Sequence, residues 1–258
     1  MANQPISWSK NKQRALRIAR LRPLIESSGH VGHGSFKMSS SRLWFPAVLP
    51  FLEGRRRGRA VVDPNQTIHQ MVKGMFMIVA VLKSGGRVTI IDTREEGASI
   101  WNRIERGGDK MPEGVSFSGT KWIGGSITNW ESIHRMVRRF AFTYQPFDSF
   151  LLKNRIRLPR YERMKRTYPG FLQIKGTEAR LRLQRRPDLL VIINPNENRH
   201  VINEGVRLNI PIVALIDTTT DSSKITLPIP INSDSLQCPS RFMGMVINLS
   251  IALQQSNP

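Results

Sequence analysis

Two apolar runs in the C-terminal third constrain the fold of this chain more than any other feature. Leu189–Ile193 and Ile212–Ile216 are continuous and rich in β-branched residues, as expected for strands that are buried on both faces. The segment between them has apolar residues at helical spacing. Its start is expected at Asn194 as the cap and Pro195 as the first helical residue, with Glu197 completing a box-like arrangement. The pattern predicts strand–helix–strand, and therefore parallel pairing through a right-handed crossover.

Two residues of that helix have expected backbone roles. Gly205 lies on the apolar face, where the lack of a side chain allows close approach to a sheet. Asn209 is expected to take the left-handed conformation just beyond the helix.

The same alternation of strand and helix appears earlier in the chain. "RAVVD" (59–63) reads as a strand, Asp63 and Pro64 then open a helix that "SGG" (84–86) ends, and "RVTIID" (87–92) and "GVSFSG" (114–119) read as further strands. Ile68, Met71, Val72, Met75, Ile78, Val79 and Leu82 form the predicted inner stripe of the helix after Pro64, and a closing helix is expected within 234–255. Five strands alternating with helices predict an open, doubly wound α/β sheet that is mostly parallel.

The segment 131–187 interrupts this order. It begins with a helical pattern and continues through Pro146, Pro159 and Pro169, which are expected to break the helix, amid dense arginine. We expect helical pieces that project from the core and no further sheet layer.

Charge is the strongest indicator of function. The chain has 39 Lys and Arg against 19 Asp and Glu, a formal net charge of +20. Residues 1–60 hold 12 basic and 2 acidic residues, and residues 131–187 hold 15 and 4. A chain this basic favours a polyanionic partner, usually nucleic acid and more rarely an anionic membrane surface. The apolar runs are too short for a transmembrane helix.

An enzyme remains an alternative on the residues alone. Asp63, Asp92, Asn194 and Asp217 each follow a predicted strand, and the carboxyl ends of parallel strands form a ligand crevice. Three aspartates there could hold Mg²⁺ for phosphoryl transfer, although starting a helix accounts for the same spacing.

Other catalytic or metal signals are weak. His30 and His33 have no acidic or cysteine neighbour in the sequence to complete a zinc site. The single cysteine, Cys238, excludes an internal disulfide. We expect no metal, no cofactor and no small-molecule substrate.

Three motifs resemble one family. "HVGH" (30–33) resembles a His-Phe-Gly-His motif, and "KWIGGSITNW" (121–130) resembles an Arg-Trp-Leu-Gly-Gly-x-Leu-Thr-Asn signature. The stretch from Pro187-Asp188 through His200, Glu204, "IPIVALIDT" and Asp221 to "PIPINSD" (228–234) resembles the C-terminal half of the same family. The chain thus resembles the S-two family of small-subunit ribosomal proteins, of bacterial and organellar type, over roughly residues 24–255.

This resemblance implies a fold and a function. The implied fold is a flavodoxin-like three-layer α/β domain with a mostly parallel five-stranded sheet and an inserted, projecting helical segment. The implied domains are a basic arm (1–23), the α/β domain (24–130 and 187–258) and the hairpin-like insertion (131–186). The implied role is a structural, non-enzymatic constituent of the small ribosomal subunit that binds its rRNA and neighbouring ribosomal proteins.

Electrostatics predicts which residues hold the RNA, because Lys and Arg contacts release the counterions condensed on phosphates. Arginine is favoured, since its fork pairs with phosphate and its plane stacks on bases. The predicted contacts are Arg55, Arg56, Arg57, Arg59, Lys121, Arg135, Arg138, Arg139, Arg155, Arg157, Arg160, Arg163, Lys165 and Arg166. Tyr161 and Tyr168 lie among them and are expected to stack on bases, whereas Trp122 and Trp130 are expected to pack where the insertion leaves the core.

The location is predicted from the excess charge and from the N-terminus. The first 22 residues contain no acidic residue, which is typical of a transit peptide or of a basic arm on RNA. The sequence favours a mitochondrial ribosome, with a plastid ribosome as second choice.

Overall fold

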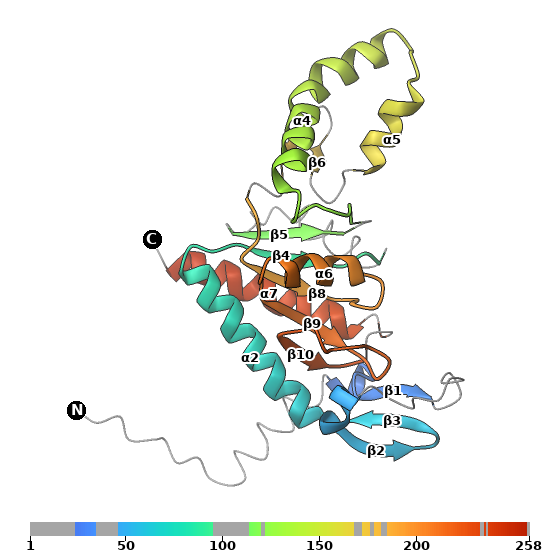
Figure 1. Cartoon of the computed structure of the whole chain (residues 1–258), viewed down its shortest axis with the longest axis vertical. Coiled ribbons are helices and arrows are strands. Elements are labelled where there is room, and N and C mark those ends of the chain that lie inside the picture. Colours follow the sequence, from blue (N-terminus) through green and yellow to red (C-terminus); the bar gives the residue numbers. More distant parts are fainter. Residues whose placement is uncertain are drawn as a thin grey trace, which may run out of the picture.

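A parallel sheet forms the centre of the molecule (Figure 1). The computed structural model describes residues 24–34, 46–94, 114–119, 122–167, 172–175, 178–181, 185–232, 235 and 237–256. The sheet consists of β4 (Val88–Ile91), β5 (Val115–Ser118), β8 (Leu189–Ile192), β9 (Ile212–Ile216) and β10 (Leu227–Pro230). Their spatial order is β10-β9-β8-β4-β5, and every pairing is parallel. Numbered along the chain this is the order 2-1-3-4-5 of flavodoxin-like sheets, so the predicted fold class is confirmed.

The two apolar runs that led to this prediction lie at the middle of the sheet. In β8, Leu189 and Val191 belong to the hydrophobic core on one face, whereas Leu190 and Ile192 belong to the core on the other. Alternate residues of β9 divide in the same way. A strand covered on both faces needs apolar side chains at every position, which is why the runs are continuous. Each fully buried Leu, Ile or Val side chain contributes roughly 1.5–3 kcal/mol.

Helices cover the sheet on both faces. α2 (Pro64–Lys83) and α7 (Gln237–Ser256) pack on one face, and α6 (Arg199–Arg207) packs on the other. In α2 the expected start is confirmed, since the Asp63 side chain accepts a hydrogen bond from the Asn65 N–H and Pro64 is the first helical residue. Its buried face centres on Gly74 and Ile78, so the predicted stripe is wrong at Val72.

Val72 is 61 % exposed because the Gly74 surface of α2 faces the sheet. A side chain at Gly74 would lie 3.1 Å from Ile229 Cδ1 of β10, so the helix approaches the sheet at the residue with no side chain. The predicted closing helix is confirmed as α7, in which Phe242 and Val246 are fully buried.

One predicted strand belongs to a different sheet. β3 (Arg59–Val62) pairs antiparallel with β1 (Val31–Gly34) and with β2 (Leu52–Arg56), which follows a 3₁₀ helix, η2 (Pro46–Phe51). Its burial alternates with period two, as in a half-solvated antiparallel strand. The fifth parallel strand is instead β10, "LPIP". It escaped prediction because proline disfavours strands, but the edge of a sheet tolerates it.

The capping prediction for α6 is also wrong. The helix begins at Arg199 with Asn198 as its cap, four residues later than expected. Asn194 instead accepts a hydrogen bond from Asn198 Nδ2 and donates to Glu197 Oε2. The end of this helix is as predicted: Asn209 has a φ of 54°, and a side chain on Gly205 would lie 2.9 Å from Leu190 Cδ1.

The segment after residue 130 projects from one end of the molecule (Figure 1). It contains α4 (Trp130–Lys153), α5 (Pro159–Thr167) and a two-stranded antiparallel ladder of β6 (Leu172–Lys175) and β7 (Glu178–Leu181). The expected helical pieces are present, whereas the ladder was not expected. α4 and α5 share a separate small core that includes Val137, Phe140, Tyr144, Leu151 and Tyr161.

Proline affects this segment less than expected. α4 runs through Pro146 without ending, and it bends as it rises from the body in Figure 1. A proline removes one backbone hydrogen bond and bends a helix, and the shared core on either side of Pro146 holds the two halves together. Pro159 is the first residue of α5, a position that suits it. Pro169 lies outside the described residues.

Candidate nucleic-acid interface

The first basic surface is the tip of the β2–β3 hairpin. Arg56 pairs with Arg59 across the hairpin, which leaves Arg57 and Gly58 as a two-residue loop. Both loop residues have positive φ, 50° and 75°, as a type I′ turn requires. The predicted contacts Arg55, Arg56, Arg57 and Arg59 are all exposed here, so the structure brings the four side chains to one turn.

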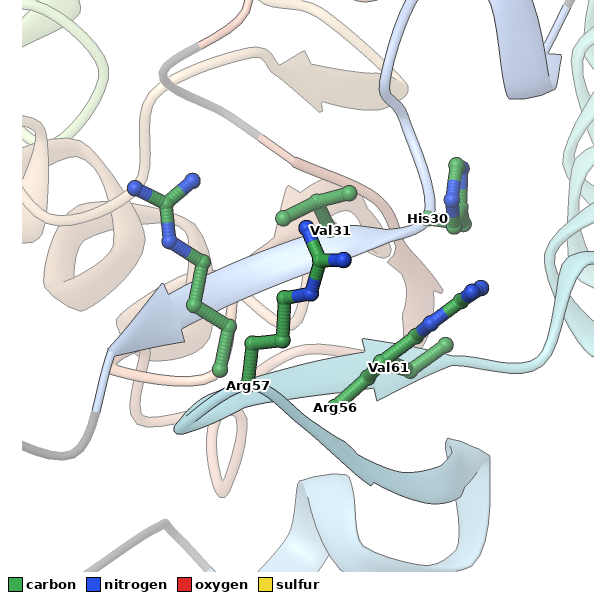
Figure 2. A pocket seen from close by; sticks show the side chains of 6 residues that line it. His30, Val31, Arg56, Arg57 and Val61 are labelled. Carbon is green, nitrogen blue, oxygen red and sulfur yellow. The ribbon is translucent and has the colours of Figure 1, made fainter.

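A hollow of about 580 Å³ opens beside this turn. It is lined by His30 and Val31 at the start of β1 and by Arg56, Arg57, Arg59 and Val61 of the hairpin. In Figure 2 the guanidinium groups of Arg56 and Arg57 extend from the hairpin beside β1, and the His30 ring lies at one end. The hairpin therefore has a concave side with positively charged walls.

The "HVGH" motif holds the hairpin sheet against the body. His33 Nδ1 lies 3.2 Å from Asp217 Oδ1 at the end of β9, and the His33 N–H donates to Thr218 Oγ1. A side chain at Gly32 would lie 2.7 Å from Thr218 Cγ2, so the close approach requires glycine. No acidic residue lies close to His33 in the sequence, but the fold brings Asp217, which is distant in sequence, beside it.

The second basic surface lies on the first half of α4. Arg135, Arg138 and Arg139 are exposed, while Val137 and Phe140 on the opposite side are buried. Phe142 follows on the same exposed side and is 87 % exposed. Arg135 and Arg139 also line a shallow hollow of about 500 Å³, together with Met136 and Thr143. The helix therefore presents a basic surface that includes apolar groups.

A buried carboxylate fixes the loop from which α4 emerges. Glu204 of α6 accepts hydrogen bonds from Trp122 Nε1 and from the backbone N–H groups of Gly125, Ile127 and Thr128. Its side chain is only 6 % exposed. The predicted packing of Trp122 and Trp130 is confirmed, since Trp122 joins the core beneath α6 and Trp130 packs against the α4–α5 core.

Sequence reasoning missed the role of Glu204, but a signal was present. The residue lies on the apolar face of α6, beside the buried Val201 and Gly205. An acidic residue on an inward face indicates buried hydrogen-bond donors, because an unpaired charge in the core is costly.

The third basic surface begins where α4 ends. The N–H of Ile156 donates to the Leu151 carbonyl, the N–H of Arg155 donates to the Leu152 carbonyl, and Arg155 has a φ of 53°. This is a Schellman ending with arginine in the position that glycine usually takes. The predicted contacts Arg155, Arg157, Arg160 and Arg163 are exposed along this turn and α5. Lys165 and Arg166 lie on the α5 backbone, and Lys121 lies outside the described residues.

The prediction that Tyr161 stacks on bases is wrong. Its ring is 7 % exposed and packs against Phe140, Tyr144 and Phe147. Its hydroxyl donates to Asp148 Oδ1 at 3.3 Å. Burial, and next the nearby Asp148 carboxylate, raise the pKa of the Tyr161 hydroxyl above its ordinary value. Tyr168 lies outside the described residues.

The aspartates of the alternative enzyme reading do not share one site. Asp63 follows β3, outside the parallel sheet, and caps α2. Asp92 at the end of β4 is buried and forms two hydrogen bonds with the Arg94 guanidinium. Asp217 is the neighbour of His33. In the ranges that the structure describes, no group of three His, Cys, Asp or Glu side chains could hold a metal ion.

The crevice of a flavodoxin-like sheet lies between its first and third strands, here β4 and β8. Local hydrogen bonds occupy it: Thr93 Oγ1 donates to Glu197 Oε2 and accepts from Asn194 Nδ2. The described part of the chain also contains no helix that is long and apolar enough to span a bilayer.

Comparison with known proteins decides between the readings. The model of the family described as Ribosomal protein S2 matches residues 24–252. The chain belongs to the ribosomal protein S2 family. Its members are structural proteins and not enzymes, which makes the chain a ribosomal protein of the small subunit with a structural role.

Curated relatives agree with this assignment. Small ribosomal subunit protein uS2 of Sinorhizobium medicae is 27 % identical over 236 residues, which cover 90 % of this chain and 85 % of the relative. The uS2 protein of Paramagnetospirillum magneticum is 29 % identical, with 90 % and 82 % covered, and that of Rhodospirillum centenum is 28 % identical, with 88 % and 81 % covered.

Proposed function

We propose that this S2-family protein is a structural constituent of the small subunit of an organellar ribosome and that it holds small-subunit rRNA through its three basic surfaces. The observation that carries the proposal is the placement of eleven exposed arginines on elements that project from the α/β body. They are Arg55, Arg56, Arg57, Arg59, Arg135, Arg138, Arg139, Arg155, Arg157, Arg160 and Arg163.

These surfaces lie at opposite ends of the molecule. The β2–β3 hairpin lies beyond the β10 edge of the sheet, and α4 and α5 lie beyond the β5 edge (Figure 1). Exposed arginines at two ends suit an extended polyanion better than a compact anionic ligand, because each phosphate contact adds counterion release. Lys121, Lys165 and Arg166 extend the proposed contacts to the neighbouring parts of the chain.

We also propose the domain organisation that was expected from the sequence. Residues 24–130 and 187–258 form the α/β domain, residues 131–186 act as one inserted arm, and the basic segment 1–23 contacts RNA or a neighbouring protein. Neighbouring small-subunit proteins are the other proposed partners, and no membrane and no small-molecule substrate take part.

A triple substitution tests the hairpin. Arg55→Ala, Arg56→Ala and Arg57→Ala together should weaken binding to small-subunit rRNA and lower the slope of log affinity against log salt by about two to three. Lys73→Ala, Lys83→Ala and Arg207→Ala provide a matched control, because these exposed residues lie on α2 and α6, outside the three surfaces. An unchanged slope in the hairpin variant, or an equal loss in the control, would remove the hairpin from the interface.

Sedimentation tests the location. The excess charge of +20 and the basic N-terminus support a mitochondrial ribosome first and a plastid ribosome second. The protein should sediment with the small subunit of a mitochondrial lysate at low salt and remain there at moderately high salt. Its consistent absence from that fraction, with recovery in the plastid or in neither organelle, would contradict the mitochondrial assignment.

A further inference from the structure

We propose that the hollow beside the β2–β3 hairpin is a binding site for one unpaired nucleotide of RNA, with its phosphate on the arginines and its base inside the hollow. This inference rests on the proposed function, because it takes RNA as the ligand. It goes further because it assigns a site that contacts an RNA base, which binding through the RNA backbone alone would not require.

The size of the hollow is the first argument. A phosphate on an RNA backbone can be held by protruding side chains on a convex turn and needs no cavity. The hollow has a volume of about 580 Å³, which falls within the range of roughly 300–1,000 Å³ typical of small-molecule sites. This volume is sufficient for a nucleoside and its phosphate.

The chemistry of the lining is the second argument. Arg56, Arg57 and Arg59 supply guanidinium groups around the opening, while Val31 and Val61 supply apolar surface from two adjacent strands. Val31 and Val61 are partners in the β1–β3 pairing, so the apolar surface is continuous across two strands. Guanidinium planes stack on bases, and apolar surface accepts their faces.

His30 is the third argument. Its Nδ1 atom is buried and has no hydrogen-bond partner within the described ranges. A buried polar atom without a partner is costly, and native structures usually satisfy it. The His30 ring itself lines one end of the hollow and offers a flat face on which a base can stack.

An unpaired nucleotide fits these groups better than a paired one. Bases within an RNA helix are stacked on their neighbours, and the deep groove of the helix hides their edges from side chains. A bulged or looped nucleotide exposes both a face for stacking and an edge for hydrogen bonding. The flanking phosphates would then remain with Arg55 and the other arginines of the turn.

The test uses the full chain and two RNA stems that carry equal charge. One stem has a bulge of three adenosines, and the other has three abasic ribose phosphates at the same place, so that only the bases differ. We expect the adenosine bulge to bind about tenfold more tightly, as stacking of a base allows. Equal affinities, with salt-dependent binding retained, would overturn this inference and leave the proposed function standing. Loss of salt-dependent RNA binding altogether would instead contradict the proposed function.

A substitution locates the effect. Val61→Phe fills the hollow without removing charge, so it should abolish the preference for adenosine while the salt slope stays the same. Val72→Phe on α2 is the matched control, because Val72 is exposed and lies outside the hollow. A preference that survives Val61→Phe in a folded variant would place the base elsewhere.

Crosslinking decides the matter if the Val61 variant does not fold. A 4-thiouridine placed in the bulge of an otherwise identical stem should crosslink the wild-type chain within residues 30–31 or 56–61. A crosslink confined to any other part of the chain would overturn the assignment of the hollow.

Discussion

The α/β body buries three carboxylates within the described residues, whereas the projecting elements bury one, Asp148, and carry the arginines of all three basic surfaces. In the described part of the body, the carboxylates of Asp92, Glu204 and Asp217 are buried. No lysine or arginine side chain of the described residues is buried anywhere in the molecule, and the hairpin, α4 and α5 expose the arginines of all three basic surfaces. Some carboxylates are therefore used internally for hydrogen bonding, whereas every described lysine and arginine side chain keeps some exposure to solvent.

The buried carboxylates of the body fix the segments that carry the exposed arginines. A buried carboxylate that accepts several hydrogen bonds fixes the geometry of the chain around it. Glu204 fixes the loop that begins α4, and Asp217 adjoins the sheet that carries the hairpin.

The largest expected effect comes from removing the buried carboxylate of Glu204. Glu204→Ala should lower the free energy of unfolding by about 3 kcal/mol or more, because Trp122 Nε1 and three backbone N–H groups lose their acceptor. Chemical denaturation measures the loss, and limited proteolysis should show new cleavage near 122–130. Glu204→Gln, which keeps the shape and one acceptor oxygen, should lose less. A change of under about 0.5 kcal/mol in Glu204→Ala would mean that the acid does not hold the base of α4.

Tyr161 tests whether the projecting part has a hydrophobic core of its own, because its ring is buried between α4 and α5. Its pKa is raised in the folded state, so the folded form favours the neutral hydroxyl. The contribution to stability is fully present below the pH at which an unfolded tyrosine ionises, near 10, and is lost as the pH rises further. Absorbance titration should show a tyrosine that ionises only with unfolding, and Tyr161→Phe should remove that signal. Ordinary titration of all three tyrosines would contradict the buried environment.

The smallest expected effect on stability comes from the two turns that carry an arginine. There, substitution should stabilise the folded protein, whereas Glu204→Ala should destabilise it. Arg57 and Arg155 both have positive φ, which costs a residue with a side chain about 1–2 kcal/mol. Arg57→Gly and Arg155→Gly should each raise the free energy of unfolding by about 0.5–1 kcal/mol while weakening RNA binding. Thermal unfolding beside an RNA titration measures both, with Arg57→Ala and Arg155→Ala as controls that remove charge without relieving the turn. A glycine variant no more stable than its alanine counterpart would show that the turn is unstrained.

Much of the body could be predicted because its signals are local. Asp63-Pro64 and Ser84-Gly85 bound α2 as expected, and the apolar runs of β8 and β9 appear where the pattern indicates. The errors concern choices that depend on distant partners. Residues 59–62 form a strand as predicted, but their alternating burial could be read only against β1 and β2. Asparagine is a common cap residue, but the Asn194 side chain forms hydrogen bonds with Thr93 and Glu197 and does not cap the helix.

The candidate interface divides in the same way. The exposed arginines were predicted from charge density alone, because a surface arginine needs no partner within the chain. The sequence could not show that Tyr161 is buried, that Asp217 lies beside His33 or that Val31 and Val61 form one apolar surface. Each of these depends on contacts between residues far apart in the chain.

The sequence by itself determined the α/β class, the two basic blocks and the family of this protein, because hydrophobic periodicity, net charge and motif spacing are properties of the linear chain. Only the tertiary structure decided which sheet each strand joins, which acids are buried and where the arginines enclose a hollow. Those outcomes depend on packing between distant segments, where a buried polar atom must find its partner wherever the fold places one.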